Sequence, residues 1–175
     1  MNEGDTVLVT GGGGFIGSHF IQRLANDHDV RVLDDFSTGA RENVSFLPDE
    51  AVISGSVTDE SVVKDAVRGV DIVVHFAAMM GVQRTLEHPR EVLAVNIDGT
   101  RNVLRAAGEA DIDRVLVAST SEVYGDAPDP PYAEDDMTAP KTNYAVSKVT
   151  DERFTAAFAE EYGFDYTIVR YFNVY

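Results

Sequence analysis

The sequence predicts an α/β fold, a doubly wound parallel sheet with helices on both faces. Strand-like apolar runs alternate with segments of helical periodicity, and the runs are continuously apolar, as strands buried on both faces require. A glycine cluster also joins the first run to the first helical segment. Right-handed crossovers between such strands place a ligand site at their carboxyl ends.

Six strand-like runs are expected, with helical patterns between most of them. The expected strands are 7–10, 30–34, 51–54, 72–75, 114–119 and 166–171, and the expected helices are 15–26, 60–68, 89–108 and 142–162. The proline-rich stretch from Gly125 to Lys141, which includes Pro128, predicts a surface loop beside the site. A length of 175 residues suits one domain with a sizeable core.

Composition excludes several classes of protein. A hydrophobic content of 44% excludes wholesale disorder. No apolar run approaches the ~18 residues of a membrane span, and no basic segment followed by an apolar one indicates a secretory signal. The sequence has no cysteine, which fits a reducing compartment. These features favour a cytoplasmic protein, and we expect no metal site.

The net charge of −16 shapes the choice of partners. Acidic residues are spread along the whole chain, and the only lysines are Lys64, Lys141 and Lys148. So negative a field repels nucleic acid and anionic lipid, so neither is an expected partner. The surface resembles that of proteins from a high-salt cytoplasm, where screening removes the self-repulsion. An ordinary acidic protein is the alternative.

The glycine cluster is Thr10-Gly11-Gly12-Gly13-Gly14-Phe15-Ile16-Gly17. A tight turn between strand and helix needs residues that tolerate positive φ. Without Cβ atoms, the backbone also lets a pyrophosphate approach the helix N-terminus, where free N–H groups favour anions. A glycine-rich linker is the alternative, but the order of strand, glycines, helix and downstream acid favours a dinucleotide site.

The downstream acid is Asp34, which ends the second expected strand twenty residues beyond Gly14. A carboxylate at this place accepts hydrogen bonds from an adenosine ribose and repels a 2′-phosphate, which favours NAD over NADP. Asp35 strengthens the repulsion. The alternative is that Asp34 only begins the following turn.

Tyr144 and Lys148 stand at positions i and i+4, so they share one face of a predicted helix. A tyrosine that acts as a base near neutral pH needs its pKa lowered by roughly 3 units, about 4 kcal/mol. A lysine ammonium one turn away and a positive nicotinamide ring favour the phenolate in this way. A half-buried tyrosine and a surface lysine on an amphipathic helix are the alternative.

A third cluster, Ser119 to Gly125, follows a buried strand and contains Thr120 and Glu122. It places hydroxyls and a carboxylate at the carboxyl edge of the sheet, where substrates bind. A simple turn rich in serine and threonine is the alternative.

Together these residues resemble the extended short-chain dehydrogenase/reductase superfamily, in its NAD-dependent nucleotide-sugar epimerase/dehydratase branch. The motifs that carry the resemblance are the glycine cluster, Asp34, His75-Phe76-Ala77-Ala78, Asn96-Ile97-Asp98-Gly99-Thr100, Ser119 to Gly125, Tyr144 to Lys148, and Arg170-Tyr171-Phe172-Asn173-Val174-Tyr175. The resemblance covers essentially the whole chain. It implies a Rossmann-fold NAD-binding domain over 1–175 and a substrate-binding domain beyond residue 175. We therefore expect residues 1–175 alone to bind NAD weakly without turnover.

The resemblance also implies a role for each position. The implied cofactor-binding residues are Gly11, Gly14, Phe15, Ile16, Gly17, Asp34, Asp35, Ser56, Val57, Phe76, Ala77, Ala78, Asn96, Tyr144, Lys148 and Phe172. Tyr144 would take the proton of the sugar 4-hydroxyl, while Lys148 binds the nicotinamide ribose and lowers the pKa of Tyr144. Thr120 would hydrogen-bond the reacting oxygen, and Asn173 would reach the substrate diphosphate.

One departure concerns the adenine contact. Many relatives end the third strand in Gly-Asp, whereas this chain has Gly55-Ser56. The adenine contact would then fall to the backbone or to Asp59.

The resemblance leaves the reaction open among several outcomes. A UDP-sugar 4-epimerase is favoured by the segments 36–39 and 81–89. The alternative is a 4,6-dehydratase or a UDP-glucuronate decarboxylase, which the Thr120-Ser121-Glu122 run resembles; Glu122 is either catalytic or a hydrogen-bond acceptor in the loop. A catalytically silent NAD-binding regulator is a further alternative, although Thr120, Tyr144 and Lys148 are all present.

Family members commonly form homodimers through two helices of each subunit. The corresponding helices here are 89–108 and 142–162, with Leu93, Val103, Leu104, Phe154 and Phe158 as apolar candidates. Core packing explains these side chains equally well.

Overall fold

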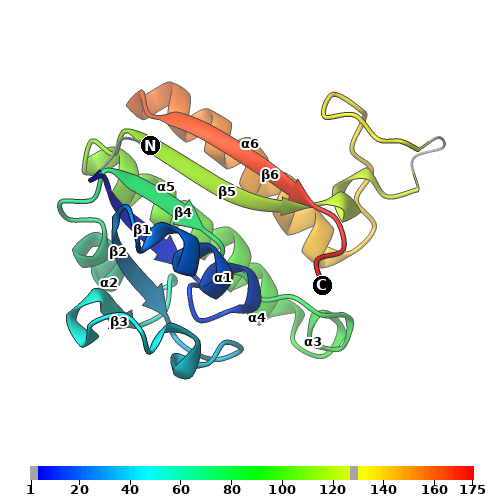
Figure 1. Ribbon diagram of the computed structural model, residues 1–175. Helices are drawn as coiled ribbons and strands as arrows, with labels where there is room; N and C mark the ends of the chain where they lie inside the picture. Colours follow the sequence, from blue (N-terminus) through cyan, green and yellow to red (C-terminus); the bar gives the residue numbers. More distant parts are fainter. Residues whose placement is uncertain (1–3, 127–129) are drawn as a thin grey trace.

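The computed structural model describes residues 4–126 and 130–175, and shows a six-stranded parallel sheet in the order β3-β2-β1-β4-β5-β6 (Figure 1). The strands are β1 (Thr6–Thr10), β2 (Asp29–Asp34), β3 (Val52–Ser54), β4 (Ile72–His75), β5 (Arg114–Thr120) and β6 (Asp165–Tyr171). The helices are α1 (Phe15–Leu24), α2 (Glu60–Ala66), α3 (Val82–Glu87), α4 (Pro89–Leu93), α5 (Gly99–Glu109) and α6 (Asn143–Tyr162). Short 3₁₀ helices cover Arg41–Val44, Asp49–Ala51 and Ser121–Tyr124, and a π-helical turn, η3, covers Ala94–Asp98.

The predicted fold class is confirmed, and each expected strand is present to within a residue at each end. The expected helix 89–108 is wrong as a single element, because the π-helical turn η3 interrupts it between α4 and α5. Helix α3 was not predicted, since six residues are too few to display a helical period.

Helix ends follow the local chemistry of the sequence. The Thr142 hydroxyl accepts a hydrogen bond from the Ala145 amide and so begins α6 at Asn143. Gly163, with φ of 86°, ends α6 in the left-handed conformation that glycine tolerates best. Asp59 caps α2 by accepting from the amides of Ser61 and Val62.

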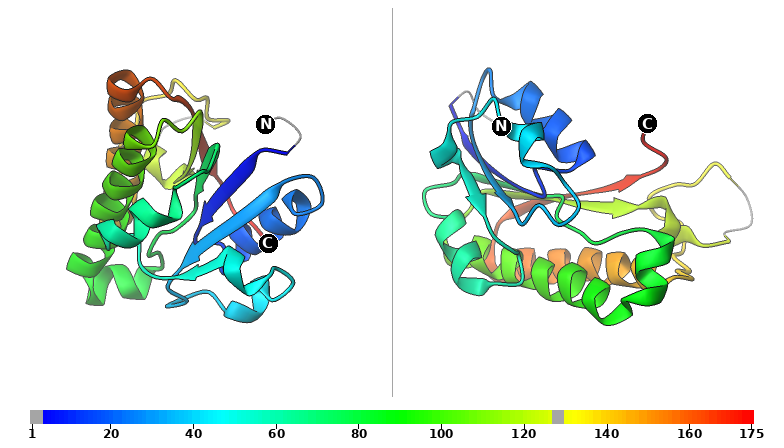
Figure 2. Two further views of the ribbon diagram at one scale, coloured as in Figure 1. Left: turned by 90° about the vertical axis from the view of Figure 1, so that its left-hand side faces the viewer. Right: turned by 90° about the horizontal axis from the view of Figure 1, so that it is seen from below.

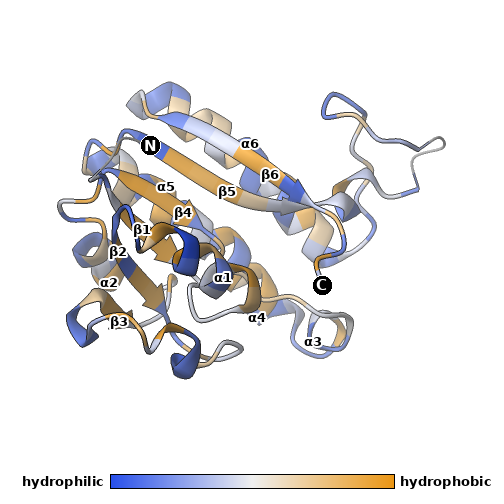
Figure 3. Ribbon diagram, viewed as in Figure 1, coloured by the Kyte–Doolittle hydropathy of each residue, from blue (hydrophilic) through white to orange (hydrophobic). Residues whose placement is uncertain are grey.

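Alternation along the strands divides the core into two layers. Leu8, Leu33 and Val73 point to one face and pack with α2, α5 and α6, while residues such as Val7 and Val9 point to the other face and pack with α1. Figure 2 shows α5 and α6 on one side of the sheet and α1 on the other. Coloured by hydropathy, the inner strands β1, β4 and β5 form the apolar centre of the molecule, whereas the edge strand β6 carries polar residues (Figure 3). Burial on both faces therefore explains why the central strands β1 and β4 are predominantly apolar.

The core also takes some of the side chains considered for a dimer. Val103 and Leu104 of α5 are fully buried, so core packing, the alternative given for them, accounts for these two side chains. Phe154 and Phe158 of α6 are only partly buried against the same core.

The sheet order reverses at β1, which pairs with β2 on one side and β4 on the other. The connection after β1 leads to β2 on one side, and the connection after β4 leads to β5 on the other. Because these two connections run in opposite directions, they leave a crevice at the carboxyl ends of β1 and β4. The expected loop after β5 contains no helix or strand in its described residues; Pro128 lies outside them. Among the described residues, no helix is both long and apolar enough to cross a membrane.

Candidate cofactor and catalytic site

A cavity of about 430 Å³ lies at the carboxyl ends of the strands. Its walls come from the loops after β1 to β4, from the ends of β5 and β6, and from the start of α6. Most predicted site residues line it: Gly11, Gly14, Phe15, Ile16, Gly17, Asp34, Asp35, Ser56, Val57, Phe76, Ala77, Ala78, Thr120, Tyr144, Lys148, Phe172 and Asn173. The topology therefore brings motifs from the whole length of the chain to one place.

The glycine loop is packed too closely to hold side chains at two positions. A Cβ on Gly11, where φ is +71°, would lie 2.6 Å from the Ala77 backbone nitrogen. A Cβ on Gly17 would lie 2.4 Å from the Gly11 carbonyl oxygen. No side chain caps the first turn of α1, so its amides are left to bind an anion in the cavity.

Asp34 is held by the loop that it faces. Its Oδ2 accepts from the Gly13 amide at 2.8 Å, and its Oδ1 accepts from the Phe36 amide at 2.7 Å. Burial raises the pKa of Asp34, against the two amide hydrogen bonds, which lower it. Each oxygen keeps a further lone pair, so the fixed carboxyl can still accept from a ribose hydroxyl.

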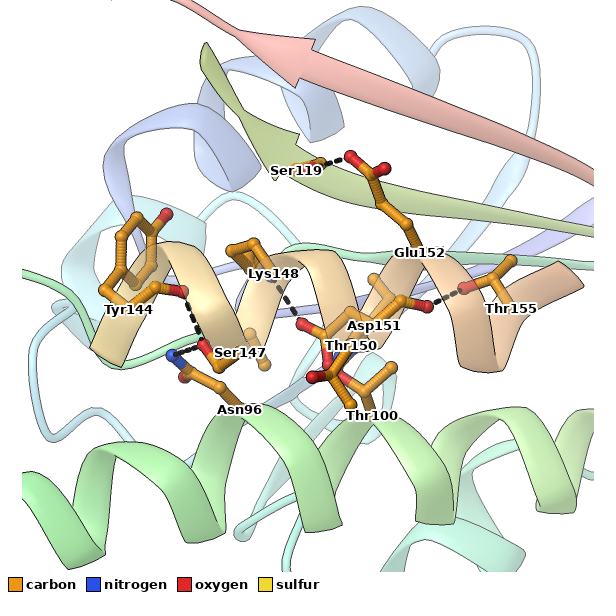
Figure 4. A network of polar contacts seen from close by, with 12 residues as sticks. Asn96, Thr100, Ser119, Tyr144, Ser147, Lys148, Thr150, Asp151, Glu152 and Thr155 are labelled. Atoms are coloured by element: carbon orange, nitrogen blue, oxygen red, sulfur yellow. Dashed lines mark hydrogen bonds and ion pairs between the residues drawn. The ribbon is translucent and has the colours of Figure 1, made fainter. Parts of the chain in front are cut away.

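Tyr144 and Lys148 lie on the same face of α6, as their spacing predicts, and both line the cavity (Figure 4). The expected lowering of the pKa of Tyr144 is not found in the chain itself. Burial, followed by the charges of Glu122 and Asp151, raises the pKa of Tyr144 to about 12. The predicted shift rested on Lys148 and a bound nicotinamide ring, and did not include the charges of these two carboxylates.

Lys148 is paired with a carboxylate inside the protein. Its Nζ donates to Asp151 Oδ2 at 3.1 Å, and the two side chains are 2% and 0% exposed. Asp151 was not predicted as a site residue, although an acid three residues after a lysine on a helix is a recognisable signal.

Thr120 and Glu122 differ in their placement. Thr120 lines the cavity, and its Oγ1 accepts from the Glu122 amide at 3.2 Å. Glu122 is exposed, is not among the cavity-lining residues, and accepts from the Thr142 hydroxyl at 3.2 Å. The geometry thus favours the hydrogen-bonding role for Glu122 over a catalytic one.

Asn96 lies behind the cavity wall. Fully buried, it accepts from the Met79 amide at 2.7 Å and donates to the Met79 carbonyl and to Ser147 Oγ at 3.1 and 3.0 Å. Ser147 in turn donates to the Tyr144 carbonyl at 2.7 Å (Figure 4). Asn96 thus joins the loop after β4 to α6, and the expectation that it touches the cofactor gains no support from its position.

A second cluster of hydrogen-bonded side chains, formed by Ser119, Glu152 and Arg170, lies at the ends of β5 and β6. Arg170 donates to both oxygens of Glu152 at 2.8 Å, and Ser119 donates to the same carboxylate at 2.6 Å. Arg170 also donates to the Tyr124 hydroxyl and to the Glu134 carbonyl, each at 2.9 Å. These bonds hold β5, β6, α6 and the loop after β5 together.

The structure also locates the residues considered for the adenine contact. Ser56 lines the cavity, whereas Asp59, offered for the adenine contact, caps α2 and does not. Ser37, Thr38, Met79 and Met80 also line the cavity and were not predicted, because they lie in turns that extend past the recognised motifs. Among the described residues, no group of three or more histidine, cysteine, aspartate or glutamate side chains is placed to hold a metal ion.

Comparison with known proteins identifies the family. The model of the NAD dependent epimerase/dehydratase family matches residues 7–175. The chain belongs to this family. A UDP-N-acetyl-alpha-D-glucosaminuronate decarboxylase from Bacillus cytotoxicus is 38% identical over 96% of this chain and 54% of its own length.

Solved structures of the family agree with this fold. A UDP-N-acetylglucosamine 4-epimerase from Methanobrevibacter ruminantium matches 99% of the chain with a TM-score of 0.92 and 34% identity, over 56% of its own length. A UDP-glucose 4-epimerase from Thermus thermophilus, solved with NAD, matches 95% with a TM-score of 0.85 and 35% identity, over 54% of its length. The chain thus spans about half the length of the relatives it matches.

The site fits the NAD on which this family depends. The close backbone approaches at Gly11 and Gly17 hold the glycine loop against Ala77 and the start of α1, where the uncapped first turn could bind a pyrophosphate in the cavity. The fixed Asp34 carboxyl stands where an adenosine ribose would bind, and Asp35 lines the same wall.

Proposed function

We propose that this chain is the NAD-binding part of an enzyme that acts on a nucleoside-diphosphate sugar, with a UDP-sugar 4-epimerase as the best candidate. The observation that carries the proposal is the meeting of Thr120, Tyr144 and Lys148 with the glycine loop in one cavity. A silent NAD-binding regulator would not need these three side chains together at the cofactor site.

The chain's own residues divide the work. When bound, NAD⁺ would supply the acceptor for the C4 hydride of the sugar and, as NADH, the donor that returns it to the other face. Tyr144 takes the proton from the 4-hydroxyl and returns it after the sugar has turned, and Thr120 holds the same oxygen by a hydrogen bond. Lys148 binds the nicotinamide ribose, and its ammonium together with a positive nicotinamide ring favours the phenolate, against the pKa of about 12 that burial and the charges of Glu122 and Asp151 give Tyr144. Asn173 reaches the substrate diphosphate.

Tyr144→Phe tests the proposed base. In the enzyme that contains this chain, the substitution is expected to lower turnover by about 10²- to 10⁴-fold while NAD⁺ still binds. Tyr166→Phe is the matched control, because Tyr166 is exposed on β6 and does not line the cavity. Full turnover in Tyr144→Phe would refute the proposed role.

The reaction itself is decided by products. The enzyme would be incubated with UDP-glucose, UDP-glucuronate and dTDP-glucose, and the sugars analysed by NMR. A 4-epimer supports the proposal, whereas release of CO₂ or accumulation of a 4-keto-6-deoxy sugar rejects it. The second candidate, a decarboxylase or 4,6-dehydratase, is favoured by the Thr120-Ser121-Glu122 run and by the decarboxylase among the relatives.

Three properties of the whole protein complete the proposal. We infer a cytoplasmic protein, because cysteine is absent. We infer adaptation to high salt from the net charge of −16, so the melting temperature should rise in molar KCl; no rise rejects this. A homodimer through α4, α5 and α6, with the partly buried Phe154 and Phe158 near the interface, would be tested by sedimentation.

A further inference from the structure

Asp151 is a buried carboxylate that none of the proposed steps uses. It lies three residues after Lys148 on α6, is fully buried, and accepts from the lysine Nζ at 3.1 Å (Figure 4). A buried charge is costly unless it is paired, so each of the two side chains supports the other's place in the protein.

A buried polar chain runs on from Asp151 to the glycine loop. Thr100 of α5 lies beneath the carboxyl (Figure 4), and its Oγ1 is 2.9 Å from His75 Nε2. The other ring nitrogen of His75, Nδ1, is 2.7 Å from Thr10 Oγ1. Thr10 directly precedes Gly11, and Thr10, His75 and Thr100 are all fully buried. Burial and the charge of Lys148 lower the pKa of His75 to about 3, so its ring is neutral and links the two hydroxyls.

One oxygen of the Asp151 carboxyl is available to take up a proton. Its Oδ1 has no hydrogen bond of normal geometry to the described residues, although the Thr100 hydroxyl is near enough to lower its pKa. The groups that act on it are Lys148, Glu152 and Tyr144 from α6 and Thr100 from α5, and the neutral His75 of β4 lies beyond Thr100. Burial is the largest effect, and it raises the pKa of Asp151 to about 6.

We propose that Asp151 is the positioning residue for Lys148: the buried ion pair fixes the lysine ammonium at the cavity wall, beside the buried Thr100 and His75. The role rests on the proposed function, in which Lys148 binds the cofactor ribose. Asp151 thereby holds the Lys148 ammonium in place before the cofactor binds.

The small number of lysines makes the pair directly observable. With lysine labelled at ¹³Cε, the chain gives three signals, and Lys64→Arg and Lys141→Arg assign two of them at exposed positions. The remaining Lys148 signal should shift in a step near pH 6 as Asp151 ionises, and Asp151→Asn should abolish the step. Glu152→Gln should keep the step but move it to lower pH, because Glu152 raises the pKa of Asp151.

A Lys148 signal without a step between roughly pH 3 and 8, a window that spans the ordinary and the raised carboxyl pKa, would overturn the pairing. This arm uses the unaltered pair, so it remains decisive even where Asp151→Asn does not fold.

The positioning role is tested by NAD⁺ affinity, measured by calorimetry. Asp151→Asn should bind NAD⁺ at least about tenfold more weakly than the unaltered chain, because a charged hydrogen-bond donor loses its fixed place. Asp98→Asn is the control; it removes an exposed acid that pairs with Arg101 and should leave the affinity unchanged. Equal affinities for Asp151→Asn and the unaltered chain would overturn the role.

The two arms separate the inference from the function on which it rests. If the unaltered chain binds no NAD⁺, the proposed function and the positioning role both fail, while the pH step of Lys148 still reports the ion pair. If NAD⁺ binds but the step is absent, the function stands and the inference alone fails.

Discussion

Lys148→Met should destabilise the fold by about 3 kcal/mol at neutral pH, because removing one partner leaves the other buried charge without compensation. The structure supports this magnitude. In the intact pair the pKa of Asp151 already rises from 3.8 to about 6, a difference of about 2 units, which corresponds to about 3 kcal/mol. Loss of Lys148 removes the largest effect that lowers this pKa, so the cost of the ionised carboxyl increases further.

The sign of the pH dependence follows from the raised pKa. Between its unfolded and folded pKa values, Asp151 binds a proton more readily in the folded state, so stability increases as pH falls through about 6 toward 3.8. Without Lys148 the carboxyl is protonated at still higher pH. The destabilisation by Lys148→Met should therefore be smaller at pH 5 than at pH 7.

Urea unfolding followed by circular dichroism at both pH values measures these effects. The double variant Lys148→Met/Asp151→Asn, which removes both charges, should lie within about 1 kcal/mol of the unaltered chain. Lys64→Met is the matched control; it breaks an exposed ion pair with Glu109 and should cost no more than about 1 kcal/mol. Single effects that simply add in the double variant, or a loss equal at pH 5 and pH 7, would refute the reasoning.

Three other predictions concern the glycine loop, the hydrogen bonds of Arg170 and the N-terminus of α6. Gly17→Ala should weaken NAD⁺ binding at least about tenfold by calorimetry, since its Cβ would lie 2.4 Å from a backbone oxygen; unchanged affinity contradicts the close packing. Arg170→Lys loses the paired hydrogen bonds to Glu152 and should lower the melting temperature by roughly 4–8 °C, equivalent to about 2 kcal/mol. An unchanged melting temperature would show that these hydrogen bonds add little to the stability of the fold. Thr142→Ala should cost about 1 kcal/mol in urea unfolding, whereas Thr142→Ser should cost much less; equal costs exclude the hydroxyl cap.

The sheet and most of the cavity could be predicted because they depend on local signals. Apolar runs of four to six residues mark the strands, and the glycine loop and Asp34 mark where two of them end. Parallel strands bring their carboxyl ends to one edge, so residues distant in sequence were placed together by topology alone.

The electrostatics of the site could not be predicted in the same way. The pKa of Tyr144 depends on its burial and on Glu122 and Asp151, which are brought near by packing rather than by a motif. Asn96 was recognised as a motif residue. Its contacts to Met79 and Ser147, however, depend on the π-helical turn η3, which hydrophobic periodicity does not predict. Local patterns thus locate the reactive groups, and long-range packing decides their charge states and contacts.

The π-helical turn η3 makes the site depend on the length of the chain as well as on its residue types. A π-turn holds one more residue than an α-helical turn, and here the segment Ala94–Asp98 carries Asn96 at its centre. Deleting one residue there would allow a regular helix from α4 into α5, with both halves close to their present orientation but with the backbone around Asn96 drawn into a regular α-helical turn. The amide of Asn96 would then no longer face both Met79 and Ser147, even with every side chain of the cavity retained.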